Sequence, residues 1–581
     1  MKRLSPIEAN TPIELSNNTF SMLFMDGDLR KVNVSGKEII QRFYFAVRDK
    51  DWLNIPYLLK NFQKKETGSK TVYSYELLFC NDTVHFETLI TITLDDGNLI
   101  LEAKGKAYST FLKNRIGFCI HLPASIKGTK CKVFHPDGTS FLFVFPELIS
   151  PYQPFKNISS IEWAFSDGNT VLSFEGDIFE MEDQRNWTDA SFKIYSTPLE
   201  NPFPVEVEKG QLFHQKITLS ISVITESKNR KIDVFDVSSD GKQENTGQTA
   251  KTLLWPSTGI ACVNNLYAIT SFREHSGKTP FSFLRIDFRF HNPEWEKKVI
   301  AGVSQAQSLN LKIYAILYFG NNFVAEAHHF VEWIKAFQGN LDFHSITLLS
   351  CETFVIRDES LQQLSRIMRD YFHHDVPIGS GTDANFAQIN RNRPNPDYLD
   401  FISYSIQPQE HASDSLSVIE NLQGQTDTVK TARSFSKEKD IHISALSIFR
   451  RFNANISFVA SNDGLQKYPY MGTDFETGWF VGSLHQLISA GIGAVTCMCQ
   501  FDKGSSLLTL FKYIAENPPE FFCCCGTSQP EQYSVLSWES GNKRHSVFAN
   551  HTNSDLYVMH PFAEVTLNPY AIYYKDESLS D

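Results

Sequence analysis

The stretch PEWEKKVIAGVSQAQSLNLKIYAILYFG, residues 293–320, decides the fold of the second half of the chain. Its first part, up to Asn310, repeats apolar residues three or four positions apart, the spacing of one face of an α-helix. Its last part, NLKIYAILYFG, is an almost continuous apolar run, typical of a strand buried on both faces. A helix followed by such a strand is the repeating unit of a parallel α/β fold.

Outward from this unit, residues 253–525 contain further apolar runs of the same kind, separated by helical segments such as DESLQQLSRIMRDYFHH. The further runs are TGIACV (258–263), FSFLRIDFRF (281–290), DFHSITLLSC (342–351), VPIGSGTDANF (376–386), DFISYSIQ (400–407), IHISALSIF (441–449) and GAVTCMCQF (493–501). With NLKIYAILYFG they predict a (β/α)8 TIM barrel, whose reactive groups lie on the loops that follow the strands. An open doubly wound sheet is the alternative, but no G-x-G-x-x-G follows the first run.

The first part of the chain, residues 1–225, has a different rhythm. Short alternating runs such as VYSYELLF and FETLITITL are separated by Gly, Asp, Asn and Pro, which predicts an antiparallel β-sandwich. Residues 226–252 are mostly polar and are interpreted as a linker or surface loop. Residues 526–581 alternate again, and we expect C-terminal β-strands that pack on the barrel or on the sandwich.

Charge and cysteine content narrow the class of protein. Lys+Arg 54 against Asp+Glu 66 gives a formal charge of -12 without a basic patch, which argues against nucleic acid and anionic membranes as partners. No apolar run is long enough for a transmembrane helix, and the start MKRLSPIEAN lacks the apolar core of a secretory signal. The adjacent thiols of Cys523, Cys524 and Cys525 favour a reducing compartment, so the expected location is cytoplasmic. No feature predicts an oligomeric state.

The densest polar stretch follows the fifth predicted strand. Asp383, Asn385, Asn390 and Arg391 lie within residues 381–393. A carboxylate, amides and guanidiniums projecting from one strand end are suited to orienting a hydroxylated substrate and stabilising a negative carbonyl oxygen. The alternative is an Asn-rich surface turn whose Asp and Asn cap a helix.

Two further candidate positions follow the sixth and the fourth predicted strands. His411 comes after the sixth strand, and Asp414 lies three residues later, so an imidazole with an orienting carboxylate is available to activate water. Asp414 is equally suited to cap a helix beginning at Ser415. Glu352 follows the fourth strand directly.

A second polar cluster lies upstream, in the string EMEDQRNWTDASFK at residues 180–193. Its candidate residues are Glu182, Asp183, Arg185, Asn186 and Trp187. A loop this polar on a rigid β scaffold is typical of a binding site. An ion-pair network that docks the sandwich on the barrel is the other interpretation.

Three enzyme classes fit the residues less well. A glycosidase needs two facing carboxyl groups, and although Glu352 occupies the position expected for one, the seventh strand ends in SIFRR. No G-x-S-x-G indicates a serine hydrolase. The pairs His328-His329 and His373-His374 are adjacent in predicted helices and point in different directions, so no metal or other cofactor is predicted.

Four strings together resemble the D-apionate lactonase family. They are YFAVRDKDW (44–52), EMEDQRNWTDASFK (180–193), GTDANFAQINRNRP (381–394) and SYSIQPQEHASD (403–414), in that order along most of the chain. The resemblance implies a hydrolase that opens D-apionolactone, or a related branched aldonolactone, to the free sugar acid. The implied partner is therefore a small-molecule sugar lactone or sugar acid.

One departure from that family concerns the end of the last barrel strand. The resemblance implies an acidic residue there, whereas this sequence has Cys497, Met498, Cys499 and Gln500. A divergent paralogue with an altered substrate or reduced activity is the corresponding expectation. Two alternatives therefore stay open: a glycoside hydrolase of similar architecture and a non-catalytic carbohydrate-binding protein.

For lactone opening, the residues are assigned as follows. His411, oriented by Asp414, activates water, Asp383 is a second acid or base, and Glu352 protonates the ring oxygen. Carbonyl and hydroxyl groups are bound by Asn385, Asn390 and Arg391. If the upstream loop reaches the barrel mouth, Glu182, Asp183, Arg185 and Asn186 complete the sugar pocket, with Trp187 as an apolar wall.

Overall fold

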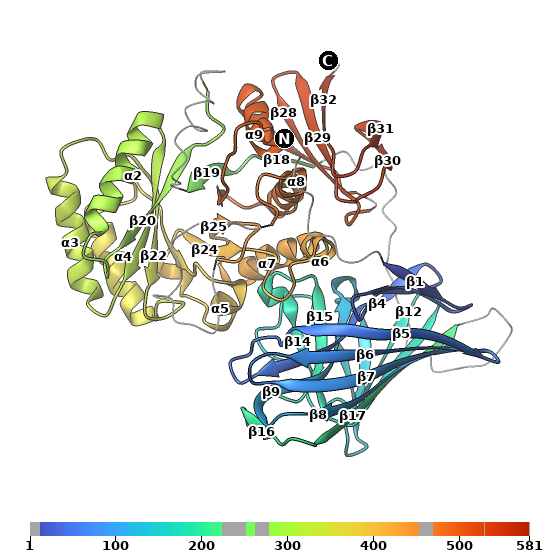
Figure 1. Cartoon of the computed structure of the whole chain (residues 1–581). Coiled ribbons are helices and arrows are strands. Elements are labelled where there is room, and N and C mark those ends of the chain that lie inside the picture. The colour runs from blue at the N-terminus through green and yellow to red at the C-terminus, as the bar shows by residue number, and fades with distance from the viewer. Residues whose placement is uncertain (1–11, 224–250, 262–277, 452–468, 528, 580–581) are drawn as a thin grey trace. The chain divides into compact units, whose positions relative to one another are not determined.

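The computed structural model of the chain describes residues 12–223, 251–261, 278–451, 469–527 and 529–579 (Figure 1). These residues fall into two compact units. The β unit contains the described residues up to Gln184 and those from Ser191 to residue 223. The barrel unit contains the described residues from 251 onward together with Arg185–Ala190, the short segment between two strands of the β unit.

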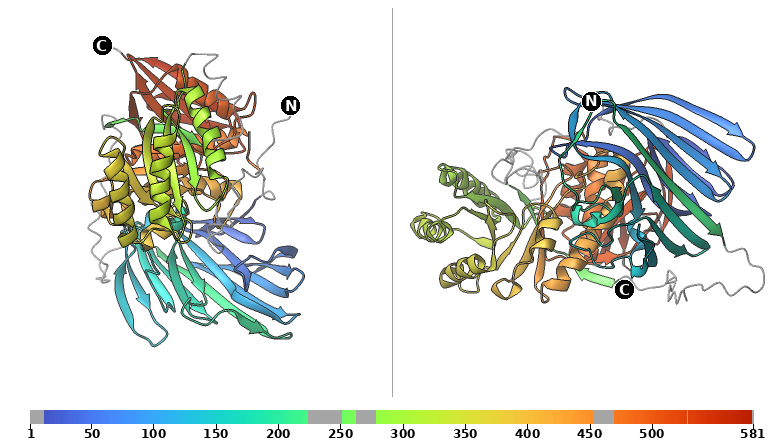
Figure 2. Two further views of the ribbon diagram at one scale, coloured as in Figure 1. Left: turned by 90° about the vertical axis from the view of Figure 1, so that its left-hand side faces the viewer. Right: turned by 90° about the horizontal axis from the view of Figure 1, so that it is seen from below.

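The β unit consists of two antiparallel sheets that share one hydrophobic core (Figure 2). Strand β7 (His85–Asp95) alternates buried with more exposed residues, as expected when one face of a strand packs on a core. The first sheet contains β1 (Ile13–Ser16), β2 (Phe20–Met25), β3 (Asp28–Val34), β4 (Lys37–Asp49), β9 (Phe111–Pro123), β15 (Ser191–Ser196) and β14 (Phe179–Asp183) in that order, with β16 (Val205–Val207) beside β9.

The second sheet of the β unit lies across the shared core. It contains, in order, β11 (Ser140–Val144), β10 (Lys130–Phe134), β12 (Ser160–Phe165), β13 (Gly168–Glu175), β17 (Leu212–Val223), β8 (Asn98–Ala107), β7, β6 (Lys70–Cys80) and β5 (Tyr57–Thr67). A short 3-10 helix, η1 (Ala124–Ile126), follows β9. Two packed antiparallel sheets are the predicted sandwich, which confirms the fold class of this region.

The barrel unit is built on a closed parallel barrel in which the first strand pairs with the last. Its strands are β19 (Ser257–Ala261), β20 (Phe283–Arg289), β21 (Lys312–Phe319), β22 (Phe343–Ser350), β23 (Ile378–Gly381), β24 (Phe401–Ile406), β25 (Asp440–Leu446) and β26 (Ala494–Cys497). Each overlaps one of the predicted apolar runs, and β19 and β25 begin one residue before theirs, so the TIM barrel is confirmed. The open doubly wound sheet is wrong, because the β19–β26 pairing closes the ring.

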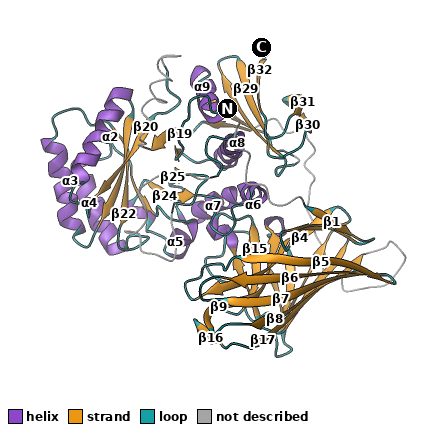
Figure 3. Ribbon diagram, in the orientation of Figure 1, coloured by secondary structure: helices purple, strands orange, loops and turns teal. Residues whose placement is uncertain are grey.

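Helices follow the strands and cover the barrel from outside (Figure 3). They are α2 (Trp295–Leu309), α3 (Phe323–Ala336), α4 (Asp358–Phe372), α5 (Phe386–Arg391), α6 (Ser415–Glu420), α7 (Leu422–Phe435), α8 (Asp474–Ser489) and α9 (Ser506–Glu516), with the 3-10 helices η2 (Gln184–Trp187) and η3 (Pro396–Tyr398). In α4, the buried residues Leu361, Leu364 and Met368 lie on one face, as their spacing predicts. Among the described helices, none has both the length and the apolar character that crossing a bilayer requires.

The C-terminal strands form a small sheet within the barrel unit. It contains, in order, β18 (Lys251–Leu254), β27 (Phe521–Cys524), β28 (Tyr533–Ser540), β29 (Lys543–Asn550) and β32 (Ile572–Ser578), beside a hairpin of β30 (Leu556–His560) and β31 (Ala563–Leu567). Helix α8 packs against β28 and β29, so these strands lie on the barrel, the first of the two predicted positions. The predicted linker 226–252 lies outside the described residues, except for its last two residues, which begin β18.

Glycine at two inward positions makes room for phenylalanine rings inside the barrel. A Cβ atom on Gly379 would lie 2.2 Å from the ring of Phe401 on the next strand, and one on Gly259 would lie 1.9 Å from Phe283. Real Cβ atoms do not approach so closely, so a larger residue displaces a buried ring.

We therefore expect Gly379→Ala to lower the stability of the barrel unit by about 1–3 kcal/mol through overpacking. Gly526→Ala is the control, because a Cβ atom there meets no atom within 4 Å. Denaturant unfolding followed by tryptophan fluorescence measures both variants. Equal stability of Gly379→Ala and Gly526→Ala would contradict the packing described here.

Candidate functional site

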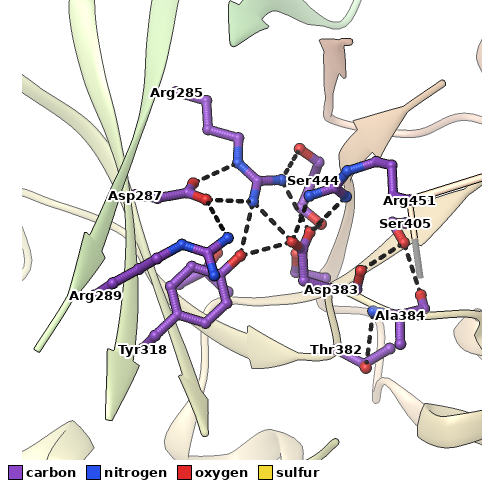
Figure 4. A network of polar contacts seen from close by, with 12 residues as sticks. Arg285, Asp287, Arg289, Tyr318, Thr382, Asp383, Ala384, Ser405, Ser444 and Arg451 are labelled. Atoms are coloured by element: carbon purple, nitrogen blue, oxygen red, sulfur yellow. Dashed lines mark hydrogen bonds and ion pairs between the residues drawn. The ribbon is translucent and has the colours of Figure 1, made fainter. Parts of the chain in front are cut away.

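Strand β20 carries three charged side chains toward the inside of the barrel (Figure 4). Arg285, Asp287 and Arg289 are two positions apart, so they project from the same face of the strand. Arg285 Nε donates to Asp287 Oδ1 at 2.8 Å, and an Arg289 Nη atom donates to Asp287 Oδ2 at 3.2 Å. The apolar residues between them face outward and are buried under the helices. The strand is therefore buried on both faces, with charges on only one.

Asp383, two residues after the end of β23, is the centre of this network. Arg285 binds its carboxylate through two Nη atoms at 2.9 and 2.8 Å, and Arg451 binds it in the same manner at 3.1 and 2.7 Å. The Tyr318 hydroxyl donates to it at 2.6 Å. One buried carboxylate thus joins strands β20 and β21 to the loops after β23 and β25.

The protonation state of Asp383 follows from these contacts. Burial by itself would raise the pKa of the carboxyl, but the charges of Arg285 and Arg451 outweigh burial and hold the pKa well below its usual range. Asp383 therefore stays ionised. This environment favours an anchoring role over the predicted role of Asp383 as acid or base.

Arginines outnumber aspartates among the described residues of this cluster. Arg285, Arg289 and Arg451 contact the two carboxylates of Asp287 and Asp383 in a partly buried setting. Burial would raise the pKa of Asp287 also, and Arg285 and Arg289 lower it below its usual value instead. A site of this kind favours an anion or a developing negative charge.

A second network connects the loops after β23, β24 and β25. The Glu410 carboxylate accepts hydrogen bonds from Asn385 at 3.1 Å, from Gln407 at 2.9 Å and from Arg450 at 2.8 Å. Asn385 and Gln407 are buried, and Arg450 is exposed. Predicted Asn385 therefore lies between the Asp383 cluster and the loop that carries His411.

His411 is held by a carboxylate from a distant part of the sequence. Its Nδ1 pairs with Asp189 Oδ2, and Asp189 Oδ1 accepts a hydrogen bond from Asn421 Nδ2 at 2.8 Å. The Asn421 side chain also accepts from the backbone N–H of Ala190 at 3.1 Å. The prediction that Asp414 orients His411 is corrected here: Asp414 caps α6, accepting from the backbone N–H and the hydroxyl of Ser417.

Asn186 and Trp187, which precede Asp189 in the upstream string, belong to the same network of contacts. The Trp187 ring lies edge-on to His411 with centroids 6.0 Å apart, and the Arg391 guanidinium lies 5.5 Å from the Trp187 ring centroid. Asn390 Nδ2 donates to Asn186 Oδ1 at 2.9 Å. Two predicted residues of the upstream string, Asn186 and Trp187, and two of the 381–393 stretch, Asn390 and Arg391, thus contact His411 or one another.

Arg185 fixes this segment through a fully buried ion pair. Its Nη1 lies 2.9 Å from Asp427 Oδ2 on α7, and both side chains are almost completely buried. Gly424, also on α7, permits the close approach, because a Cβ atom there would lie 3.1 Å from the carbonyl oxygen of Thr188. The surface of α7 therefore allows residues 185–190 to pack closely against it.

Three other predicted residues lie elsewhere. Asp183 belongs to the β unit, where it accepts from the backbone N–H of Ser150 at 3.0 Å, and Glu182 pairs across β14 and β15 with Lys193. Glu352 is exposed on the loop after β22. No described contact joins any of these three to His411 or Asp383.

Sequence reasoning missed several residues of the site. Arg285 and Asp287 are charged residues at alternating positions within a strand expected to be buried, and that conflict is a usable signal of an inward polar face. Tyr318 has no such signal, because a tyrosine in a buried strand is ordinary. Asp189 lies inside the string that was selected, but nothing local indicates that it pairs with His411.

Within the described ranges, no group of three or more His, Cys, Asp or Glu side chains is placed to hold a metal ion. The described side chains with evident chemical potential are the imidazole–carboxylate pair of His411 and Asp189 and the arginine cluster around Asp383. A closed parallel barrel that carries such groups on the loops after its strands is typical of TIM-barrel enzymes. Their active sites lie at this end of the barrel.

Comparison with known families identifies the class more closely. The family model described as D-apionate lactonase, N-terminal domain, matches residues 4–223, and the one described as D-apionate lactonase, TIM barrel domain, matches residues 268–504. The chain belongs to the D-apionate lactonase family. A D-apionate lactonase from Brucella anthropi is 25% identical over 513 residues, covering 84% of this chain and 82% of that protein.

Solved structures show weaker similarity. A β-arabinopyranosidase is 8% identical, with 98% of this chain and 99% of that chain covered and a TM-score of 0.32. A GH30 endoxylanase from Clostridium papyrosolvens is 10% identical, with 57% and 96% covered and a TM-score of 0.33. Scores this low do not support a shared function.

The Asp383 cluster leads to a stability prediction. Asp383→Asn keeps the shape of the side chain but leaves the buried guanidinium of Arg285 and the partly buried one of Arg451 without their shared counter-charge, so we expect a loss of about 3–5 kcal/mol. Asp397→Asn is the control, because that carboxylate pairs with Lys437 at the surface and contributes little. Denaturant unfolding at pH 7 measures both.

Comparison of wild type with Asp383→Asn also gives a test by pH. Since the pKa of Asp383 is lowered in the folded state, its contribution is present above the pKa of an unfolded aspartate, about 3.9, and is lost as the pH falls below that value. The stability difference between wild type and Asp383→Asn should therefore shrink below about pH 4. A difference that is constant from pH 7 to pH 3 would contradict the ionised state assigned to Asp383.

Proposed function

We propose that this protein hydrolyses the ester bond of a sugar-derived lactone, with D-apionolactone as the first candidate, and releases the sugar acid. The observation that carries the proposal is the His411–Asp189 pair on a barrel of the D-apionate lactonase family. Opening a lactone requires an activated water, stabilisation of the tetrahedral oxyanion and a proton for the departing alkoxide.

His411 is assigned as the base that activates water. With Nδ1–H donating to the Asp189 carboxylate, the Nε2 lone pair is the one that accepts the proton. Asp189 holds the imidazole in this tautomer and stabilises the imidazolium that forms, and Asn421 in turn holds Asp189. The protonated imidazole then returns its proton to the ring oxygen as the C–O bond breaks, so one residue serves both steps.

The arginine cluster around Asp383 is assigned to the oxyanion. Arg451 is the guanidinium that reaches from the loop after β25 while its orientation is set by two hydrogen bonds to Asp383. A preoriented guanidinium in a partly buried site stabilises developing negative charge without reorganisation. In this assignment Asp383 positions Arg451 and takes no proton.

The remaining predicted residues are assigned to substrate recognition. Asn385 and Asn390 offer amide groups to sugar hydroxyls, and the Trp187 ring, beside Arg391, offers an apolar face to the carbon skeleton. Glu352 as the proton donor to the ring oxygen stays a prediction. Its exposed position makes His411 the better supported donor.

Glycoside hydrolysis is the less favoured alternative. A glycosidase acid needs a raised pKa, whereas Asp287 and Asp383 both have a lowered pKa because of their arginine partners. A carbohydrate-binding role without catalysis is the other alternative, motivated by buried Cys499 beside Gln500 where the family resemblance implies an acid. Assays of turnover on lactones and on glycosides distinguish the lactonase, the glycosidase and the non-catalytic binding protein.

An assay across D-apionolactone, other aldonolactones and aryl glycosides tests the proposal, with spontaneous hydrolysis subtracted and a chelator-treated sample run in parallel. We expect turnover of at least one lactone and none of the glycosides. Turnover of an aryl glycoside instead would support the glycosidase alternative. Binding of a sugar lactone without turnover would support the non-catalytic one.

Two aspartates near His411 allow a matched test of the dyad. Asp189→Asn removes the charge that orients the imidazole, and we expect kcat/KM on the lactone substrate to fall by about 10²–10⁴. Asp414→Asn alters the cap of α6, and we expect a stability change of about 1 kcal/mol with turnover close to wild type.

Circular dichroism controls for the folding of both variants. Equal turnover of folded Asp189→Asn and Asp414→Asn would remove Asp189 from the mechanism. Undiminished turnover of folded His411→Ala would remove the dyad as a whole.

A further inference from the structure

The β unit contains a cavity that the barrel site does not use. It lies where β8, β9 and β17 meet the loop before β14, and its volume is about 380 Å³, within the range of small-molecule sites. Buried apolar side chains of Phe45, Ala103 and Ile116 line one part of it. The polar side chains of Lys113, Asp177, Thr197, Gln211, His214 and Gln215 line the rest.

Lys113 is the unusual member of this lining. Its side chain is half-buried, and its ammonium lies 4.9 Å from the centroid of the Phe213 ring. The described residues provide no hydrogen-bond acceptor and no ion-pair partner for its Nζ atom. Burial lowers the pKa of Lys113, and the charge of Asp177 only partly opposes this effect. A half-buried ammonium without a counter-charge is costly unless a ligand supplies one.

Asp177 faces the same cavity without pairing with Lys113. Its carboxylate accepts from the Thr197 hydroxyl at 2.7 Å and from the backbone N–H of Ile178 at 2.7 Å. No ion pair within 4.0 Å joins it to Lys113 among the described residues. The two opposite charges therefore lie more than 4.0 Å apart on the lining of the same cavity.

The other polar groups of the lining are held in place by the protein. Gln215 donates to the Ser196 hydroxyl at 2.8 Å and accepts from the backbone N–H of Phe118 at 2.9 Å. His214 Nε2 lies 2.8 Å from a Glu102 carboxylate oxygen. These contacts keep the wall of the cavity rigid, as a preformed ligand site requires.

We propose that this cavity binds a polyhydroxylated carboxylate, the chemical class of the sugar acids. The carboxylate pairs with Lys113, hydroxyl groups donate to Asp177 and interact with Thr197, and the carbon chain lies against the ring of Phe213. A neutral sugar leaves Lys113 without its counter-charge, and a polyanion such as phosphate is repelled by Asp177. The site lies wholly within the β unit, so it is independent of the function proposed for the barrel.

Reductive methylation of the full-length protein tests this site locally. Formaldehyde and dimethylamine borane modify accessible lysines, and peptide mass spectrometry gives the rate at each position. We expect sodium D-gluconate to slow modification of Lys113 about elevenfold at ten times its dissociation constant. Lys132 is the internal reference, because it is also half-buried and its ammonium lies 5.0 Å from a phenylalanine ring, that of Phe134, outside the cavity.

Three further probes test the ligand chemistry. Acetate carries only the carboxylate, D-glucitol only the hydroxyl groups, and glycine betaine is a zwitterion without hydroxyls. We expect each to protect Lys113 much less than D-gluconate does. Absence of protection by D-gluconate, or protection by any of the other three that equals or exceeds it, overturns the proposal.

Variants of the opposite wall complete the test. Asp177→Asn weakens the hydroxyl contacts, so the D-gluconate concentration for half-protection of Lys113 should rise at least about tenfold, the value of one charged hydrogen bond. Thr197→Val, a smaller change, should raise it several-fold. Asp167→Asn is the control, since that half-exposed carboxylate lies outside the cavity near Lys37. Unchanged half-protection in both cavity variants would also overturn the proposal.

Discussion

The carboxylate of Asp383 between two guanidiniums is the interaction on which the site depends. Asp383 lies in the loop after β23, and its two guanidinium partners come from β20 and from the loop after β25, three strands that are not neighbours in the closed barrel. A buried ion pair of this kind contributes little net stability but strongly disfavours arrangements in which one partner is missing. Its main effect is therefore to specify where Arg451 lies.

From this centre the polar contacts extend in one direction around the barrel rim. Asn385 follows Asp383 by two residues and reaches Glu410, which precedes His411. Because β23, β24 and β25 are neighbours, their loops meet without long connections. The Asp383 cluster and His411 are thus carried by a continuous set of loops, and the proposed function requires such an arrangement, because the carbonyl and the attacking water must be addressed together.

Periodicity was sufficient to predict the barrel, since strands buried on both faces are continuous apolar runs and helices between them are amphipathic. It also predicted that Asp383 and His411 follow barrel strands, and they lie after β23 and β24, two parallel neighbours whose loops share one rim. Periodicity does not predict which side chains pair with one another. Asp414 lies three residues from His411 and was the natural choice, whereas Asp189 lies 222 residues away and only the folded chain shows the contact. The charged residues within β20 conflict with the burial of that strand. Their partner Asp383, in the loop after β23, cannot be identified from either segment alone.

The position of Asp189 has a consequence for how the gene can be divided. The histidine is encoded with the barrel, and its carboxylate is encoded with the sandwich, between β14 and β15. A fragment starting near residue 250 would contain every barrel strand and yet carry an imidazole without its orienting group. Under the proposed function, exchange of the first domain for an unrelated module removes the carboxylate of the dyad together with the sandwich.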